Sequence, residues 1–94
     1  MIDITIVSSN PRDYDRIIAS DLAVEPYVVF IDELKEKTKA YDFKSQYGAR
    51  LSPFVLVSKD FKDYYTFYKE IYEDPIRELI QVLNSDEFLT PKKE

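Results

Sequence analysis

Residues 46–57 read QYGARLSPFVLV and contain the pattern that decides the fold. Gly48 stands where a helix would need a left-handed C-terminal cap, a conformation that glycine adopts without steric cost. Pro53 comes directly before an apolar run, and a proline at the start of a buried strand occupies a place where no backbone donor is needed. The stretch therefore predicts the end of a helix, a loop and a buried strand over 54–57.

Two further elements are predicted after this stretch. The aromatic run 64–68, YYTFY, is typical of a strand and follows a short charged segment, so it predicts a hairpin with the strand at 54–57. Asp74 is a good helix cap, and Pro75 suits the first helical position. Apolar side chains then recur at helical spacing, at Ile76, Leu79, Ile80 and Leu83. The sequence therefore predicts a last helix from residue 75.

The N-terminal half predicts two strands with a helix between them. Residues 2–6 alternate apolar and polar side chains and Val7 follows, which predicts a strand over 2–8, and 27–31 are a β-branched and aromatic run typical of a buried strand. Asn10 is expected to cap a helix that Pro11 opens. The apolar residues of that helix are Tyr14, Ile17, Ile18 and Leu22. Such a unit has parallel strands joined by a right-handed crossover.

A second helix is predicted over 33–47, with Asp32 as its cap, because these residues are mostly good helix formers. Its expected apolar contacts are Leu34, Tyr41 and Tyr47. The complete order is β-α-β-α-β-β-α, which predicts an α/β fold with a four-stranded mixed sheet flanked by helices. We expect residues 1–88 to form this single domain and 89–94 to form a short C-terminal tail.

The segment 47–53 resembles the pattern Tyr-Gly-x-Arg-x-x-Pro of the thioredoxin-like superfamily, which includes thioredoxins and glutaredoxins. The matching residues are Tyr47, Gly48, Arg50 and Pro53. The similarity covers 47–83, and the N-terminal half agrees in element order alone. The resemblance implies a thioredoxin-like fold and a cis peptide bond between Ser52 and Pro53.

The chain departs from that family at the position of the reactive cysteines. Thioredoxins and glutaredoxins carry Cys-x-x-Cys at the start of the first helix, whereas residues 8–14 here read SSNPRDY. The chain has no Cys, so thiol–disulfide exchange is excluded. The glycine that the family usually has before its last helix is replaced by KEIYE at 69–73.

Composition excludes further classes of function. The 94 residues include 18 acidic and 13 basic side chains and no His, so the net charge of −5 gives no basic footprint for nucleic acid. Without His and Cys, zinc sites and imidazole catalysis are excluded. No apolar run approaches the ~20 residues that cross a bilayer, and residues 1–7 predict a strand rather than a secretory signal. We expect a cytoplasmic protein without a membrane partner, or one that enters a virion or other assembly from the cytoplasm; the composition suits a small phage-encoded protein.

No metal or cofactor is expected. The acidic pairs at 13 and 15, 60 and 63, and 73 and 74 lie at helix starts or turns, where aspartate is common, and none has the framework of a cation-binding motif. The hydroxyls of Ser8, Ser9 and Tyr14 leave one alternative. It is a glutathione- or peptide-binding protein similar to glutaredoxins or glutathione transferases, with Ser or Tyr in place of the thiol. Strand-end and helix-capping chemistry explains these serines more simply, so no catalytic residue is singled out.

Two binding surfaces are predicted. The resemblance implies a groove at the cis-proline loop, made by Ser9, Asn10, Arg12, Leu51, Ser52 and Pro53. The strand at 64–68 is expected at a sheet edge, where Tyr65 and Tyr68 would contact a protein partner or a second copy of the chain. Packing within the hairpin is the alternative role of these tyrosines. We therefore expect a non-catalytic thioredoxin-like protein-binding or assembly module without redox activity.

Overall fold

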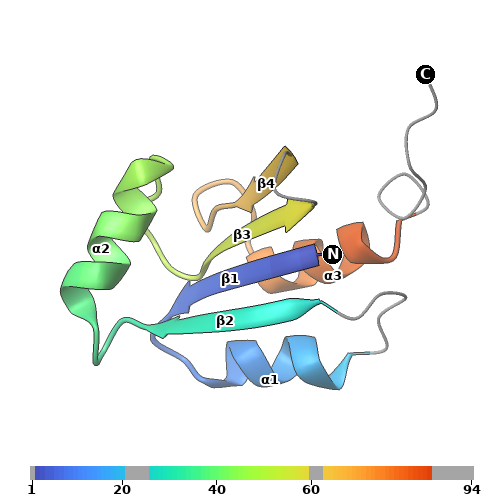
Figure 1. Ribbon diagram of the computed structural model, residues 1–94, viewed down its shortest axis with the longest axis horizontal. Coiled ribbons are helices and arrows are strands. Elements are labelled where there is room, and N and C mark those ends of the chain that lie inside the picture. Colours follow the sequence, from blue (N-terminus) through green and yellow to red (C-terminus); the bar gives the residue numbers. More distant parts are fainter. Residues whose placement is uncertain (1, 21–25, 60–62, 86–94) are drawn as a thin grey trace.

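The computed structural model describes residues 2–20, 26–59 and 63–85. Within them the elements follow the predicted order β-α-β-α-β-β-α (Figure 1). Their bounds are β1 Ile2–Ser8, α1 Arg12–Ala19, β2 Tyr27–Asp32, α2 Lys37–Gln46, β3 Phe54–Lys59, β4 Asp63–Phe67 and α3 Pro75–Leu83. The expected α/β class with a four-stranded mixed sheet and three helices is therefore confirmed for the described residues.

The strands form one sheet in the order β2-β1-β3-β4. Strand β1 pairs in parallel with β2 and antiparallel with β3, which in turn pairs antiparallel with β4. In this register Ile4 lies between Val28 and Val57. The expected hairpin of β3 and β4 is thereby confirmed, and β2 and β4 are the edges of the sheet.

One face of the sheet packs against α1 and α3. Because side chains alternate between faces along a strand, Ile4 and Ile6 of β1 lie on this face beside Val55 and Val57 of β3. All four are fully buried. The helices contribute Ile17, Ile76, Leu79 and Leu83 to the same core. This core fixes the starts of α1 and α3 relative to the ends of β1 and β4.

The opposite face packs against α2 at one end of the sheet (Figure 1). Phe54 is fully buried there beside Val7 and Ala40. The rings of Phe43, Tyr47 and Tyr68 lie with their centroids 5.9, 5.8 and 5.4 Å from that of Phe54. This aromatic cluster holds α2 and the loop after it against the start of β3.

Several predicted local signals are confirmed. Gly48 has a φ of 76°, the left-handed conformation expected after α2, and the Ser52–Pro53 peptide bond is cis. The Asp74 side chain caps α3 by accepting a hydrogen bond from the Arg77 backbone N–H. No helix within the described part of the chain is long and apolar enough to cross a membrane.

Some predicted boundaries were wrong. The helix predicted over 33–47 begins at Lys37, because the carbonyl and carboxylate of Asp32 instead accept hydrogen bonds that form a turn over 33–36. The strand predicted over 64–68 runs from Asp63 to Phe67. In α1, Ile18 is exposed rather than part of the core, and Leu22 lies outside the described residues.

Candidate functional site

Three loops meet at the end of the sheet where β1 finishes. Val7 pairs with Phe54, and Val55 pairs with Phe67, so β1 and β4 end where β3 begins. Three loops therefore lie at the same end of the sheet, namely 9–11, 47–53 and 68–74. This is also the carboxyl end of the parallel pair β1 and β2, the place where α/β sheets commonly hold ligands.

The three loops enclose an open groove of about 790 Å³. Residues 8–10 line it on the α1 side, Ser52 and Pro53 line it at the cis-proline loop, and Lys69 with 73–75 line it on the α3 side. Most of these side chains are polar or charged. Of the predicted groove residues, the structure brings Ser9, Asn10, Ser52 and Pro53 together, whereas Arg12 and Leu51 are exposed outside the lining.

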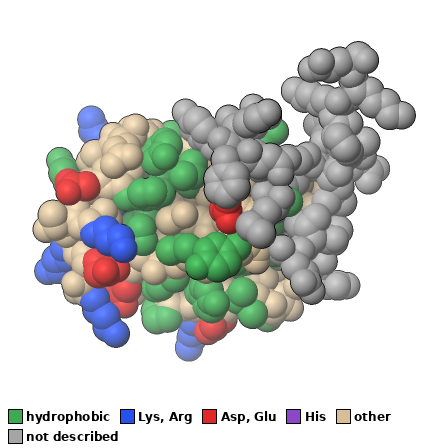
Figure 2. Space-filling model, viewed as in Figure 1, with side chains coloured by type: hydrophobic (Ala, Val, Ile, Leu, Met, Phe, Trp, Pro, Cys, Tyr) green, Lys and Arg blue, Asp and Glu red, His purple; other side chains and the backbone are tan. Residues whose placement is uncertain are grey.

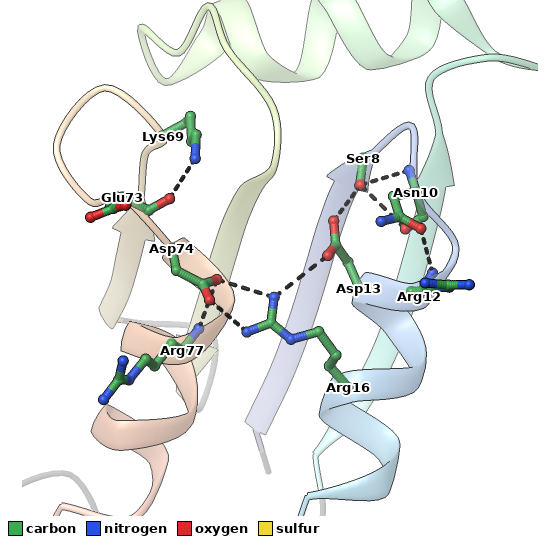
Figure 3. Close-up of polar contacts among 9 residues, drawn as sticks. All are labelled: Ser8, Asn10, Arg12, Asp13, Arg16, Lys69, Glu73, Asp74 and Arg77. Atoms are coloured by element: carbon green, nitrogen blue, oxygen red, sulfur yellow. Dashed lines mark hydrogen bonds and ion pairs between the residues drawn. The ribbon is translucent and has the colours of Figure 1, made fainter.

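A buried carboxylate lies at the α1 side of the groove (Figure 3). The Ser8 hydroxyl donates a hydrogen bond to Asp13 Oδ2 at 2.5 Å and accepts one from the Asn10 backbone N–H at 3.0 Å. The Asn10 side chain stabilises the turn that leads into α1, since its Oδ1 accepts from the Arg12 N–H at 3.0 Å. The polar groups of Ser8 and Asn10 are therefore engaged in holding the β1–α1 loop.

An ion pair joins α1 to α3 beside the groove (Figure 3). Arg16 donates from Nη1 and Nη2 to the two carboxylate oxygens of Asp74, at 3.1 and 2.7 Å, and its Nη1 lies 3.8 Å from Asp13 Oδ1. The hydrogen bonds from Arg16 hold the pKa of Asp74 below its usual range, and the same bonds raise the pKa of Arg16. Because Asp74 also caps α3, the pair fixes the starts of both helices.

A second polar cluster lies at the cis-proline loop, next to α2. Lys44 Nζ donates to Glu33 Oε1 at 2.7 Å, to Ser52 Oγ at 3.1 Å and to the Arg50 carbonyl at 3.3 Å. Ser52 donates its own hydroxyl proton to Glu33 Oε1. Burial by itself raises the pKa of Glu33, but the hydrogen bonds from Lys44 and Ser52 and the Lys44 charge together lower it. The cluster binds α2, the turn after β2 and the cis-proline loop together.

The cis-proline loop is also tied to the loop before α3. The Arg50 backbone N–H donates to Glu70 Oε2 at 3.0 Å, and this bond lowers the pKa of Glu70. Nearby, the Tyr68 hydroxyl donates to the Tyr47 carbonyl at 2.5 Å. These contacts connect two of the three loops that enclose the groove.

The structure separates the two tyrosines expected at the edge strand. Tyr65 lies on β4 and shares its face with Phe67, on the side of α1 and α3. Tyr68 follows β4, is half-buried, and packs on Phe54 on the opposite side. They therefore do not form a joint surface, and Tyr68 has the packing role that was the alternative.

The hydroxyls weighed for glutathione activation differ in position. Ser8 is buried and its hydroxyl donates a hydrogen bond to Asp13, and Tyr14 lies outside the groove with its ring centroid 6.3 Å from that of Phe30. Ser9 alone of the three is exposed in the groove lining. Among the described residues, no three acidic side chains gather as a cation would require, and Asp60 lies outside them.

Sequence reasoning missed the charged residues that shape the groove. Asp13 and Ile17 are four residues apart and share the buried face of α1, and the same spacing puts Lys44 on the buried face of α2 with Ala40. A charged residue on an apolar helix face is a signal that was available. The partners Glu33, Glu70 and Asp74 come from distant parts of the chain, so no local pattern indicated them.

Comparison with protein-family models, with curated proteins and with solved structures finds no match for this chain.

Proposed function

We propose that the protein is a thioredoxin-like domain that binds a protein partner and catalyses no reaction. The observation that carries the proposal is the open groove of about 790 Å³ at the carboxyl end of β1, shaped by ion pairs and hydrogen bonds between its loops. A chain without Cys or His has no thiol or imidazole to act in such a groove. Binding is the role that this chemistry leaves.

Two features of the chain support a thioredoxin-like fold. The strand order β2-β1-β3-β4, with β3 antiparallel to β1, suits the β-α-β-α-β-β-α arrangement of thioredoxins and glutaredoxins. The cis Ser52–Pro53 bond directly before β3 stands where that family has its cis-proline. The groove of the present chain then corresponds to the place where those proteins bind extended peptides and glutathione.

The polar groups around the groove support binding rather than catalysis. The hydroxyls of Ser8 and Ser52 donate hydrogen bonds to Asp13 and Glu33, and the Lys44 ammonium has three acceptors. A nucleophile needs an accessible position as well as a neighbouring base, and Ser8 is buried. These groups instead satisfy one another, which stabilises the loops in one shape.

Exposed apolar side chains on the loops that enclose the groove suit a protein partner. Leu51 lies in the cis-proline loop and Ile71 in the loop before α3; both are exposed and outside the groove lining. A partner that occupies the polar groove and reaches over these loops would contact both side chains. Apolar contacts of this kind, surrounded by polar groups, are common at protein interfaces.

The proposal is tested by capture of partners from cells of the native source. We expect the immobilised protein to retain a stoichiometric partner that the Leu51→Asp/Ile71→Asp variant loses. Ile18→Asp, an exposed apolar residue on α1, is the matched control and should retain it. A partner that binds all three proteins equally would contradict the groove as the site, and no retained protein at all would contradict the binding module.

Ser9 supports one alternative, because its hydroxyl is exposed in the groove. A glutathione-binding protein would show saturable amide shifts at Ser9 and Ser52 when reduced glutathione is added to labelled protein. Shifts of this kind without a captured partner would favour that alternative. Self-association through the edge strand β4 is tested by sedimentation of wild type beside Tyr65→Ser.

A further inference from the structure

The α2 end of the molecule has a charge opposite to that of the whole chain. Residues 33–50 contain five cations and three carboxylates, a net charge of +2, whereas the chain as a whole carries −5. The remaining residues therefore carry −7. On the face that Figure 2 shows, most of the Lys and Arg side chains lie at the end of the molecule where Figure 1 places α2. This segment is an electropositive region on an acidic protein.

Two grooves lie at this end, one on each side of Tyr41. The first, of about 290 Å³, is lined by Leu34, Lys37 and Tyr41 together with the buried face of α2. The second, of about 320 Å³, is lined by Tyr41, Arg50 and the residues around Gly48. Leu34 is 67% exposed and Tyr41 69% exposed. Large apolar side chains that flank grooves are the features by which a folded surface holds a partner.

The cations around these grooves differ in how far they are neutralised. Lys44 is paired with Glu33 at 2.7 Å, and Lys39 lies 3.9 Å from Glu36. Lys37 is exposed and makes no ion pair or side-chain hydrogen bond with any other residue that the structure describes. Its ammonium, beside exposed apolar side chains, is available to a carboxylate of a partner.

We propose that this surface, made by Leu34, Lys37, Tyr41 and Arg50, docks an acidic segment of a partner protein. An apolar side chain of the segment lies between Leu34 and Tyr41, and the carboxylates of the segment face Lys37 and Arg50. Charge complementarity selects the partner, because most of this chain is acidic and attracts an acidic segment only at the α2 end. Glu33, Glu36 and Asp42 stand among the cations, which disfavours the continuous negative charge of a nucleic acid.

This docking surface is separate from the cis-proline groove. The first of its two grooves shares only Ser9 with the larger groove, and none of the four docking residues lines the larger one. The inference therefore does not depend on the proposed function. Loss of groove binding leaves it standing, and its failure leaves the proposed function standing.

The test is selection from a phage-displayed library of random 12-residue peptides on the folded wild-type protein. We expect the enriched peptides to combine Asp or Glu with Leu, Ile or Phe. Synthetic copies should bind Lys37→Glu/Tyr41→Ser about tenfold more weakly. Raising the salt from about 0.05 M to about 0.5 M should weaken binding to wild type, because the charges face solvent.

The matched control is Arg12→Glu/Ile18→Ser on α1, which makes the same charge change and also removes an exposed apolar side chain. The control should bind the peptides as wild type does. Circular dichroism checks that both variants are folded, and Lys37→Glu alone gives a milder change on the same surface. Selected peptides without acidic residues, or equal affinity for both variants, would overturn the proposal.

Two other occupants are distinguished by the same variants. A fluorescent single-stranded oligonucleotide that binds wild type and is lost with Lys37→Glu/Tyr41→Ser would replace the peptide by a nucleic acid. Concentration-dependent dimers in sedimentation that disappear with this variant would replace it by a second copy of the chain. Either result would overturn the acidic segment as occupant.

Discussion

Replacing Lys44 with Met should destabilise the fold more than any other loss of a single charge on α2. The Lys44 side chain is 11% exposed and that of Glu33 21% exposed, so both charges are largely removed from water. The Lys44 ammonium donates to Glu33, to Ser52 and to a backbone carbonyl. Met fills a similar volume but leaves the Glu33 carboxylate with Ser52 as its remaining side-chain donor.

The expected loss follows from how far the pair is buried. Breaking a fully buried ion pair costs about 3–5 kcal/mol, and a hydrogen bond to a charged group contributes about 1.5–3 kcal/mol. Because Glu33 keeps some contact with water, we expect Lys44→Met to lower the free energy of unfolding by about 2–3 kcal/mol. Replacing both residues, as Lys44→Met/Glu33→Leu, should cost less than the sum of the single changes, since no charge is then left unpaired.

Urea unfolding followed by circular dichroism at neutral pH measures this loss. The matched control is Lys39→Met on the same helix, whose side chain is 62% exposed and whose partner carboxylate is 3.9 Å away. That change should alter stability by less than about 0.5 kcal/mol. If the two variants lose the same stability, the structural role assigned to the Lys44 cluster is refuted.

The dependence of the free energy of unfolding on pH tests the same Lys44 cluster independently. The folded-state pKa of Glu33 lies below its ordinary value of 4.5, so Glu33 binds a proton more readily in the unfolded chain. Its contribution is therefore present above pH 4.5 and is lost as the pH falls through the folded-state pKa. Lys44→Met should reduce this acid-side loss of stability, and an unchanged pH profile would contradict the pairing.

Three further changes test other parts of the fold by the same unfolding assay. Asp74→Ala removes the cap of α3 and the partner of Arg16, and it should cost about 1–2 kcal/mol. The folded-state pKa of Asp74 lies below 3.8, so the stability that Asp74 contributes to wild type is lost as the pH falls through that pKa. The Asp74→Ala variant should lack this acid-side loss of stability. The same dependence of stability on pH in both proteins would count against the ion pair. Gly48→Ala should cost about 1–2 kcal/mol from the positive φ alone, since no atom lies within 4 Å of the added methyl group, and a neutral change would show that the turn adopts another conformation. Phe54→Ala should cost about 3–5 kcal/mol because it empties the centre of the aromatic cluster, whereas Ile18→Ala at an exposed position should change little; similar losses would contradict this assignment of the core.

The order of the elements could be predicted because its signals are local. A two-residue period over 2–6, the aromatic run before residue 68 and the Asp74-Pro75 cap each depend on neighbours in the sequence. Gly48 was predicted correctly for the same reason, since only its own backbone conformation was at issue. The start of α2 was missed because an aspartate carboxylate can accept backbone hydrogen bonds either at a helix start or in a turn, and Asp32 accepts one in a turn.

The charged residues of the site could not be placed from local patterns. Asp13 and Lys44 are buried on helix faces that ordinarily hold apolar side chains, because their partners come from other elements. Arg16 and Asp74 are 58 positions apart and meet only after α1 and α3 pack on the same face of the sheet. The separation of Tyr65 and Tyr68 likewise depends on where β4 ends.

By itself, the sequence determined the α/β class, the order of strands and helices, and the absence of thiol and imidazole chemistry, because periodicity, capping and composition are properties of the chain. The tertiary structure alone decided which polar groups are paired and where the groove opens. A buried charge is stable only beside its partner, and that partner is brought near by packing of the hydrophobic core rather than by sequence proximity.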